Sequence, residues 1–563
     1  MIKNFSGINY KAFEDFNVQL KPLTILLGAN SCGKSAILNS FLMLAQSLDS
    51  SAQSEMPLRL NGNRVGMGEP LNIIKDKNED NALEFTFEVD SIDSTNNLIE
   101  GLKRDFLDAN YSFVRFLAQD VRKKKSLQNL VRKNLESIDE IFYRGENLSK
   151  VQLKSMSSKI IDIIKIYRGN LADSVEHAKI QMPRFVLDYT ENVAYNKIGE
   201  CFTHILSLKT IDLCAKKITL RFKYNKKNES INITDFTLNN ENGNVILSLS
   251  VKERNDLDLK SDIIDNEVLR RSRQDFKKTL NLKSLLICNF ESSIGRVSSI
   301  FNTETTNPLA IYFSKVIGAS FKELKNSFSG ENINHVSPLR AFPQRYYLLD
   351  KAIYHKQLNS MDGTELAEIL KNRKDIVKSI NDLLIKFNIT IEVDKVNDII
   401  HKIIVNQDAV KLELTDVGFG ISQVLPILVQ ALLSPVSSIT IIEQPEIHLH
   451  PKMQAWLTDA LINIAVKNNK IFVIETHSDA LVRRLRLRII DDENALTEEH
   501  VAIYYLERDR KKNKTNMKKM EVTSEGDISW PSEFMDVEIS DTLLIQKKKV
   551  EKMMKLHLGD RDA

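Results

Sequence analysis

The residues best suited to chemistry form the run Gly28-Ala-Asn-Ser-Cys-Gly-Lys-Ser35. It matches the pattern G-x-x-x-x-G-K-S/T and lies between an apolar segment, Leu23–Leu27, and a helix-like segment, Ala36–Leu48. Glycines let the backbone approach phosphate oxygens, and N–H groups at a helix start favour an anion. Lys34 suits the terminal phosphates, and the Ser35 hydroxyl suits Mg²⁺. A chance match in a glycine-containing turn is the alternative. The flanking elements favour a phosphate loop whose binding residues are Gly28, Asn30, Ser31, Cys32, Gly33, Lys34 and Ser35.

Two further apolar runs, Ser438–Glu443 and Lys470–Glu475, end in acids. Each is short and almost continuously apolar, which is typical of a buried strand. A carboxylate at the end of such a strand suits a Walker B acid, so we expect Glu443 to hold Mg²⁺ through its waters opposite Ser35. Shortly after the second run comes His477, which we expect to contact the γ-phosphate.

A glycine-bearing turn, Asp416–Gln423, opens an apolar helix upstream of these runs. The N–H groups of a helix's first turn have no partner inside the helix, and they favour anions. We therefore expect this turn to face a phosphate through Gly418, Gly420 and Ser422.

With these pieces in this order, the chain resembles the ABC/SMC-type ATPases, in the branch of prokaryotic AAA-family proteins related to the OLD nucleases. The segment Ile442–Pro451 is similar to the family's Walker B region, and Asp416–Gln423 stands where the family has its signature turn. Val336–Arg340 resembles its central GPLR motif, with Ser337 in place of the usual glycine, and Glu521–Asp536 resembles its C-terminal element. The resemblance covers about 1–90 and 335–540. Within the branch, the chain is most similar to the PtuA family, the ATPases of Septu-type and retron-associated anti-phage systems.

The resemblance implies a protein that binds ATP with Mg²⁺ and forms a head-to-head homodimer or a higher oligomer. Each composite site would take its phosphate loop from one subunit and its signature turn from the other. It further implies an HNH nuclease partner of the PtuB type and, in retron-associated members, a reverse transcriptase with its msDNA. The implied function is a nucleotide-gated scaffold that restrains the nuclease until phage infection disturbs it.

One residue departs from the family pattern at the position where ABC ATPases have a glutamate that activates the attacking water. Here the residue after Glu443 is Gln444. A neutral amide orients water but does not accept its proton, and loss of a general base costs about 10²–10⁴ in rate. We expect slow hydrolysis and a long-lived ATP-bound dimer unless Glu446 substitutes as the base.

The predicted fold class is α/β, an ABC-type ATPase head with a parallel phosphate-loop sheet and an antiparallel N-terminal sheet. A helical and β-meander insertion separates Walker A from the signature turn, and strands are expected at Lys217–Tyr224, Ser230–Thr237 and Asn244–Val251. One helix is expected over Thr364–Lys386. The predicted domains are 1–95, the N-terminal half of the head with Walker A; 96–334, the insertion; 335–500, the C-terminal half with signature turn, Walker B and His switch; and 501–563, a C-terminal strand–helix element.

The composition indicates the cellular environment in which the protein is expected. Four cysteines without a C-x-x-C pair indicate a reduced protein with neither a disulfide framework nor a zinc site, and His448 and His450 have no further ligands at zinc spacing. No apolar stretch reaches membrane-spanning length, and the N-terminus lacks a signal-peptide profile, so we expect a cytoplasmic protein without membrane contact. The formal net charge of +3 does not by itself argue for nucleic acid.

Several basic clusters are candidates for contact with nucleic acid. Each is equally consistent with a solvent-exposed surface. For Arg508–Lys519, which lies between two strand-like runs, the sequence favours a solvent-facing hairpin tip. The clusters are Arg122–Lys125, Arg270–Arg273, Arg483–Arg488 and Arg508–Lys519.

Three other functions are alternatives, and each predicts a sequence feature that can be checked. An SMC-like repair or chromosome ATPase would have long heptad arms, and the sequence shows no sustained heptads. A self-contained OLD-type nuclease would need a Toprim domain after His477, and too little chain follows it. The long insertion argues against a compact transporter subunit.

Overall fold

The computed structural model describes residues 2–50, 55–89, 92–121, 127–143, 148–169, 193–252, 256–288, 305, 307–348, 358, 365–491, 496–530 and 544–552. Contacts between residues divide the chain into two compact units. Unit 1 comprises Met1–Val18 and Asn39–Gly330, and unit 2 comprises Gln19–Leu38 and Glu331–Ala563. The phosphate-loop segment therefore packs with the C-terminal half of the chain.

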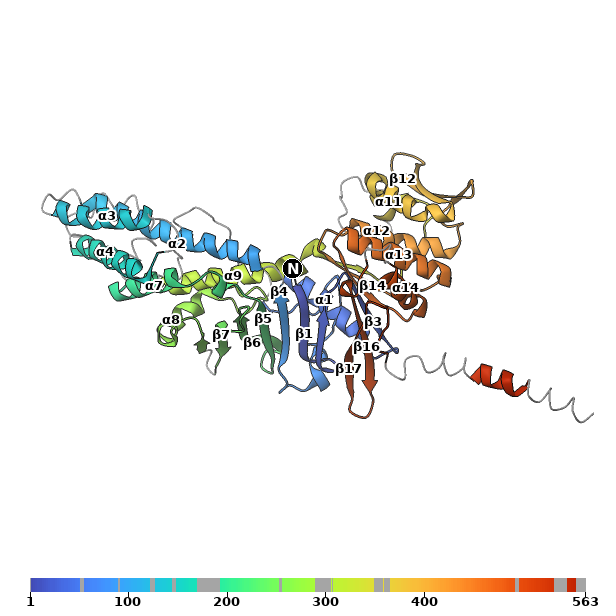
Figure 1. Ribbon diagram of the computed structural model, residues 1–563, viewed down its shortest axis with the longest axis horizontal. Coiled ribbons are helices and arrows are strands. Elements are labelled where there is room, and N and C mark those ends of the chain that lie inside the picture. Colours follow the sequence, from blue (N-terminus) through green and yellow to red (C-terminus); the bar gives the residue numbers. More distant parts are fainter. Residues whose placement is uncertain are drawn as a thin grey trace, which may run out of the picture. The chain divides into compact units, whose positions relative to one another are not determined.

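Unit 1 contains an antiparallel sheet with the strand order β8-β7-β6-β5-β4-β1-β2 (Figure 1). The pairings β5–β6 and β6–β7 confirm the predicted meander. In β5 buried and exposed side chains alternate, as expected for a strand with one covered face. The strands are β1 (Ile2–Tyr10), β2 (Phe13–Gln19), β4 (Leu83–Val89), β5 (Lys217–Asn225), β6 (Ser230–Asn239), β7 (Val245–Val251) and β8 (Leu257–Lys260).

The helices of unit 1 include most of the insertion. Helices α2, α3, α4 and α7 lie together as one group, in which α4 contacts the other three (Figure 1). On α3 the buried residues Val131, Leu135 and Ile138 follow helical spacing, which gives the helix its covered face. The helices are α1 (Lys34–Asp49, whose first turn belongs to unit 2), α2 (Ile92–Val121), α3 (Gln128–Tyr143), α4 (Lys150–Gly169), α7 (Tyr195–Ser207), α8 (Asn266–Thr279) and α9 (Pro308–Phe328).

Unit 2 is built on the sheet order β17-β16-β3-β15-β14-β9. Strands β16, β3, β15, β14 and β9 run parallel, and β17 pairs antiparallel with β16. The central strands are almost wholly apolar and buried, as strands covered on both faces are. The strands are β3 (Leu23–Gly28), β9 (Ile333–Val336), β14 (Ile439–Glu443), β15 (Ile471–Glu475), β16 (Val501–Asp509) and β17 (Lys514–Met520).

A second, smaller sheet in unit 2 has the order β10-β12-β11, and β13 pairs with β12. These strands are β10 (Tyr347–Leu348), β11 (Ile389–Lys395), β12 (Ile400–Gln407) and β13 (Val410–Glu413). The helices are α10 (Glu365–Asn372), α11 (Lys374–Leu384), α12 (Phe419–Leu433), α13 (Pro451–Lys467) and α14 (Asp479–Ile490). The mixed α/β class predicted from the sequence is confirmed.

Two local predictions need correction. The single helix expected over Thr364–Lys386 is interrupted, because Arg373 has the non-helical angles φ −111° and ψ 75° and separates α10 from α11. The strand β9 was not expected, since its short sequence precedes a Pro-punctuated segment. Its pairing partner, β14, lies far along the chain and supplies the hydrogen bonds.

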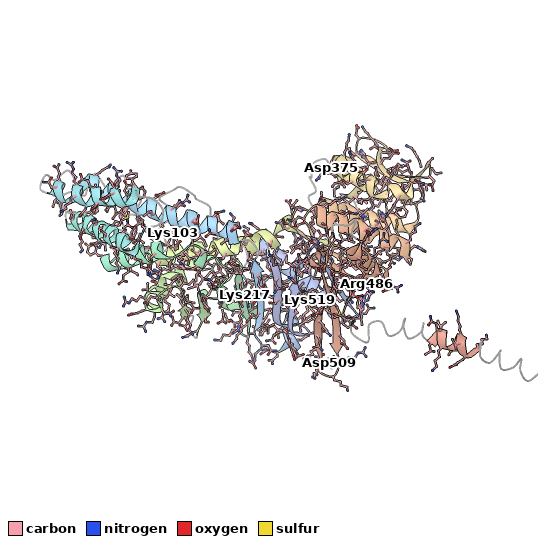
Figure 2. The ribbon with its side chains drawn as sticks, in the orientation of Figure 1. Lys103, Lys217, Asp375, Arg486, Asp509 and Lys519 are labelled. Atoms are coloured by element: carbon pink, nitrogen blue, oxygen red, sulfur yellow. The ribbon has the colours of Figure 1, made fainter. Side chains whose placement is uncertain are left out.

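The segment Arg508–Lys519 forms most of a hairpin between β16 and β17, as its sequence favoured. Figure 2 labels Asp509 and Lys519 on this hairpin. Asp509 accepts hydrogen bonds at the turn from the backbone N–H groups of Lys511 and Lys512.

The other basic clusters are largely engaged in contacts. Arg271 and Arg273 on α8 pair with Glu267 and Asp256. Arg122–Lys125 lies outside the described residues. None of the described helices has the length and hydropathy that crossing a membrane would require.

A buried ion-pair cluster ties α13 to α14 in unit 2. Both Asp459 oxygens accept hydrogen bonds from Arg484, at 2.8 and 2.6 Å, and from Arg488, at 2.8 and 3.0 Å. Although burial alone would raise it, these hydrogen bonds lower the pKa of Asp459 to about 2. The ionised carboxylate therefore stabilises the folded protein above the unfolded pKa of about 3.9, and this contribution is lost as the pH falls toward 2.

We expect Asp459→Asn to destabilise unit 2 by about 3 kcal/mol at pH 7, because it removes the carboxylate that Arg484 and Arg488 share and leaves Arg488 with Asp491 alone. Thermal unfolding of variant and wild type from pH 7 down to pH 3.5 measures the difference. The difference should narrow below about pH 4, because the carboxylate of the unfolded wild-type chain becomes protonated there, whereas that of the folded chain has a lower pKa.

Asp375→Asn is the matched control, since Asp375 (Figure 2) forms an exposed pair with Arg373. It should cost less than about 1 kcal/mol. Equal destabilisation by the two variants would contradict a special role for the Asp459 cluster.

Candidate functional site

The phosphate loop connects the end of β3 to the first turn of α1. Positive φ angles at Gly28 (144°), Ser31 (63°) and Gly33 (101°) fold the backbone back on itself. A Cβ on Gly28 would lie 2.3 Å from the Leu506 carbonyl oxygen, so both the angle and the neighbouring strand require glycine. In this conformation the loop leads directly into the N-terminus of α1, where backbone N–H groups favour an anion.

Lys34 and Ser35 both contact one carboxylate, that of Glu475 at the end of β15. The Ser35 hydroxyl donates to Glu475 Oε2 at 3.2 Å, and Lys34 Nζ lies 3.7 Å from Glu475 Oε1. Lys34 also donates to the carbonyl oxygens of Gly28 and Ala29, each at 3.0 Å. Burial raises the pKa of Glu475, and the Lys34 ammonium acts in the opposite direction.

Glu443, the predicted metal acid, lies one strand further from the loop. Its Oε1 is 2.7 Å from His335 Nε2 on β9. In the parallel β14–β15 pair Glu443 is in register with Glu475, so the two acids end adjacent strands at the same sheet edge. Glu475, and not Glu443, makes the contact to Ser35.

Sequence reasoning missed Glu475 as a site residue. The signal was available, because Glu475 ends an apolar run in the same way as Glu443 does. What the sequence did not reveal is the strand order, which inserts β15 between β3 and β14. It also gave no sign of the His335 partner of Glu443.

Three hydrogen bonds hold the turn after β14, one to strand β15 and two from the Arg340 side chain. The Gln444 N–H donates to the Glu475 carbonyl at 2.7 Å, and the Arg340 Nη2 donates to the carbonyls of Glu443 and Gln444, each at 3.0 Å. Burial lowers the pKa of Arg340 to about 10. The arginine of the GPLR-like segment therefore fixes the backbone beside the site.

Each carboxylate oxygen of Glu446 accepts a hydrogen bond. Its Oε2 accepts from the Thr476 hydroxyl at 2.8 Å, and its Oε1 accepts from the His477 backbone N–H at 2.7 Å. Burial, followed by the Lys34 charge, lowers the pKa of His477, so its imidazole is neutral at physiological pH. These hydrogen bonds orient the Glu446 carboxylate and link it to the segment after β15.

A pocket of about 430 Å³ lies over the loop and brings together five of the seven residues predicted for the phosphate loop. Its lining residues are Asn30, Ser31, Gly33, Lys34, Ser35, Ala36, Gln444 and Glu475. The Cys32 side chain is buried instead, which raises its pKa.

The signature-turn residues are not part of this pocket. Gly418 is the N-cap of α12 and makes no side-chain cap, and a Cβ built on it meets nothing within 4 Å. Ser422 is buried. His450 caps α13 by accepting the Lys452 N–H at 3.3 Å, so it has a structural role.

The lining residues fit a nucleotide with Mg²⁺. In the lining, the Ser35 hydroxyl and the Glu475 carboxylate supply hard oxygen donors, the type that Mg²⁺ prefers, and the Glu443 carboxylate ends the next strand outside the lining. Lys34 and the helix start supply positive charge for phosphates. The pocket also lies at the carboxyl ends of parallel strands, where open α/β sheets bind their ligands.

Known proteins are similar to this chain through a family model and through partial matches to single relatives. A family model described as "AAA ATPase domain" matches residues 1–482. Two Staphylococcus aureus proteins, one from strain MRSA252, are described as uncharacterized chromosomal cassette SCCmec type IVc proteins; each is 25% identical over 220 residues, 38% of this chain and 28% of the relative. The matched region thus spans less than a third of their length.

Solved SMC heads show weaker likenesses. The SMC head bound to the C-winged helix domain of ScpA has a TM-score of 0.34 at 9% identity, covering 92% of this chain and 98% of that chain. The SMC head of Thermotoga maritima has a TM-score of 0.32 at 7% identity, covering 92% and 99%. At these TM-scores the likenesses do not bear on what this chain does.

The phosphate loop, the acids at the ends of neighbouring parallel strands and the pocket over them define a P-loop nucleotide-binding protein. Because the family model spans more than half of the chain, the protein belongs to the AAA ATPase domain family. It is an ATPase.

We expect Glu475→Gln to weaken the Mg²⁺ dependence of nucleotide binding about tenfold, because the amide keeps a hydrogen-bond acceptor for Ser35 but lacks the charge that favours a cation. Titration of a fluorescent ATP analogue, with and without Mg²⁺, measures this. Without Mg²⁺, the nucleotide affinity of the variant should equal or exceed that of the wild type, because no carboxylate competes with the phosphates for Lys34.

Glu507→Gln, an exposed acid on β16, is the control and should leave both titrations unchanged. If Glu475→Gln gives the wild-type Mg²⁺ dependence while Glu443→Gln abolishes it, Glu475 has no part in holding the cation.

Proposed function

We propose that this ATPase closes around ATP as a dimer, hydrolyses it slowly and, in the ATP-bound form, regulates a partner nuclease in defence against phage. The observation that carries the proposal is the composition of the pocket. Lys34, Ser35, Gln444 and Glu475 line it, whereas the glycine turn at the start of α12 lies outside it.

The turn at α12 has the properties of a contact surface for a second nucleotide. No side chain caps the helix start, so its first N–H groups lack an intrahelical partner. The space beside Gly418 is open. A phosphate from the pocket of another copy would supply the missing acceptors, and the turn would complete that copy's site. Gly418 and Gly420 support this better than the buried Ser422.

Slow hydrolysis is supported by the groups that surround the pocket. Gln444 contributes a neutral amide, and both oxygens of Glu446 are engaged by Thr476 and His477. The Glu475 carboxylate faces Lys34 and Ser35, the side of phosphates and metal. No other side chain of the described pocket lining is a carboxylate that could accept a proton from water.

The proposed partner is a nuclease of the HNH type, on the strength of the sequence resemblance to the PtuA family. A retron-type reverse transcriptase with its msDNA is the second partner considered, on the same ground. A long-lived ATP-bound dimer suits such a role, because a scaffold must keep its partner restrained for longer than one rapid catalytic cycle.

We expect Gln444→Glu to accelerate single-turnover ATP hydrolysis by about 10²-fold, because a carboxylate beside the nucleophile supplies the missing general base. Gln444→Ala is the control and should not accelerate it. Rapid hydrolysis by the wild type, at about 10 s⁻¹, that persists in Glu446→Gln would contradict the proposed slow cycle.

We expect two variants to separate ATP binding from dimerisation, and both from defence. Lys34→Ala should lose nucleotide binding, ATP-dependent dimerisation and phage protection, since it removes the phosphate-binding charge. Gly418→Trp should bind ATP like the wild type yet fail to dimerise or protect, because the indole occupies the open space at the turn. Size-exclusion chromatography with ATP–Mg²⁺ and phage plating efficiency, with an HNH nuclease of the PtuB type co-expressed, are the measurements.

Gly101→Trp on α2 is a matched control, as a Cβ there also meets nothing within 4 Å. It should behave as wild type in all three assays. Full protection by Lys34→Ala would overturn the defence proposal, and a normal dimer in Gly418→Trp would overturn the composite site.

A further inference from the structure

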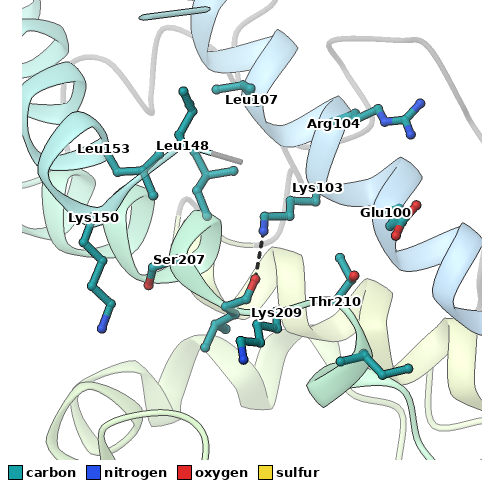
Figure 3. A pocket seen from close by; sticks show the side chains of 13 residues that line it. Glu100, Lys103, Arg104, Leu107, Leu148, Lys150, Leu153, Ser207, Lys209 and Thr210 are labelled. Carbon is teal, nitrogen blue, oxygen red and sulfur yellow. Dashed lines mark hydrogen bonds between the residues drawn. The ribbon is translucent and has the colours of Figure 1, made fainter. Parts of the chain in front are cut away.

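A cavity of about 460 Å³ lies within the helical insertion of unit 1, and none of its lining residues belongs to the phosphate loop (Figure 3). It is formed by α2, the start of α4, the end of α7 and the segment that follows α7. Its volume falls in the range of sites that hold small organic ligands. The nucleotide site does not use it.

The wall of this cavity is largely aliphatic. Leu107 comes from α2, Leu153 from α4 and Leu206 from α7, and Leu153 and Leu206 are buried. Leu148 and Ile211 extend the same surface. None of the described lining residues is aromatic, so the cavity offers no stacking platform for a nucleobase.

Lysines from three segments stand around the aliphatic wall. Lys103 Nζ donates to the Leu208 carbonyl at 2.8 Å, which holds its ammonium across the cavity (Figure 3). Lys150 and Lys209 make no ion pair with any residue that the structure describes. Figure 3 shows the Arg104 guanidinium directed away from Lys103 and its hydrogen bond, so the charge of Arg104 does not add to that of the lysines.

A single acid, Glu100, lines the cavity against these lysines. It accepts a hydrogen bond from Asn96 at 3.2 Å. The excess of positive charge therefore has no compensating group in the described lining. An apolar wall combined with uncompensated ammonium groups is complementary to a ligand that carries both an apolar body and a negative charge.

We propose that this cavity binds a small amphipathic anion with an aliphatic body and one terminal anionic group, such as a medium-chain carboxylate. The body packs against Leu107, Leu153 and Leu206. The anionic group lies toward Lys150 and Lys209, with Lys103 at the side. The proposal does not depend on the nucleotide site or on the proposed role in defence.

The test uses the full-length chain and the probe 1-anilinonaphthalene-8-sulfonate, an apolar body with one sulfonate, followed by fluorescence. The probe should bind saturably, and dodecanoate should displace it, whereas millimolar inorganic phosphate should not. Lys150→Glu/Lys209→Glu should weaken binding about tenfold or more, because both attractive charges become repulsive. The Arg substitutions at the same two positions should restore it.

Lys133→Glu/Lys154→Glu makes the same change in net charge at exposed positions of α3 and α4 outside the cavity, and it should bind the probe as wild type does. The uncharged N-phenyl-1-naphthylamine should be insensitive to both double variants. Unchanged thermal unfolding of the variants shows that they fold.

Three results would overturn the proposal. The first is probe binding that Lys150→Glu/Lys209→Glu leaves unchanged, which places the probe elsewhere. The second is equal sensitivity of the neutral probe, which removes the charge from the recognition. The third is displacement by ATP as effective as by dodecanoate in the Lys34→Ala background, which would make the ligand a nucleotide.

Discussion

The site depends on one buried carboxylate, that of Glu475, which faces the two side chains that must meet a triphosphate. An ammonium as buried as that of Lys34 is costly without a compensating charge. Glu475 supplies that charge, while the carbonyls of Gly28 and Ala29 accept the remaining hydrogen bonds. These contacts hold Lys34 and the loop in the conformation described above. A triphosphate must offer Lys34 better partners than Glu475 does, and a cation must take over the carboxylate.

Strand β15 connects this carboxylate to the signature helix. At its start, Lys470 Nζ donates to the carbonyls of Ala431 and Leu432 at the end of α12, each at 2.8 Å. At its end, Glu475 contacts the phosphate loop and Thr476 contacts Glu446. A shift of α12 on contact with a second copy would therefore act on the same strand that carries the site. In the proposed dimer, this connection would couple ATP binding to the contact between copies.

Much of the site was predictable because its signals are local. The phosphate loop needs glycine at positions with positive φ, and Lys34 and Ser35 follow at fixed spacing. The antiparallel meander was predictable too, since its turns carry their own residue signature. The roles of Glu475 and His335 were not, because they depend on pairings between strands far apart in the sequence. The break at Arg373 was missed for a different reason: a continuous helical pattern on both sides conceals one non-helical residue.

The aliphatic, lysine-lined cavity lies in the helical insertion, which contributes no residue to the phosphate loop. A ligand there influences ATP turnover only if its affinity differs between the conformations of the protein that ATP selects. Such a coupling is reciprocal, so ATP must change the affinity of the cavity for its ligand by the same factor. The lysines provide a route to such a difference. Ammonium groups without carboxylate partners repel one another. An anion between them removes that repulsion and draws α4 and the segment after α7 together. The insertion would then respond to the charge of its ligand, whereas the head responds to the charge of its nucleotide.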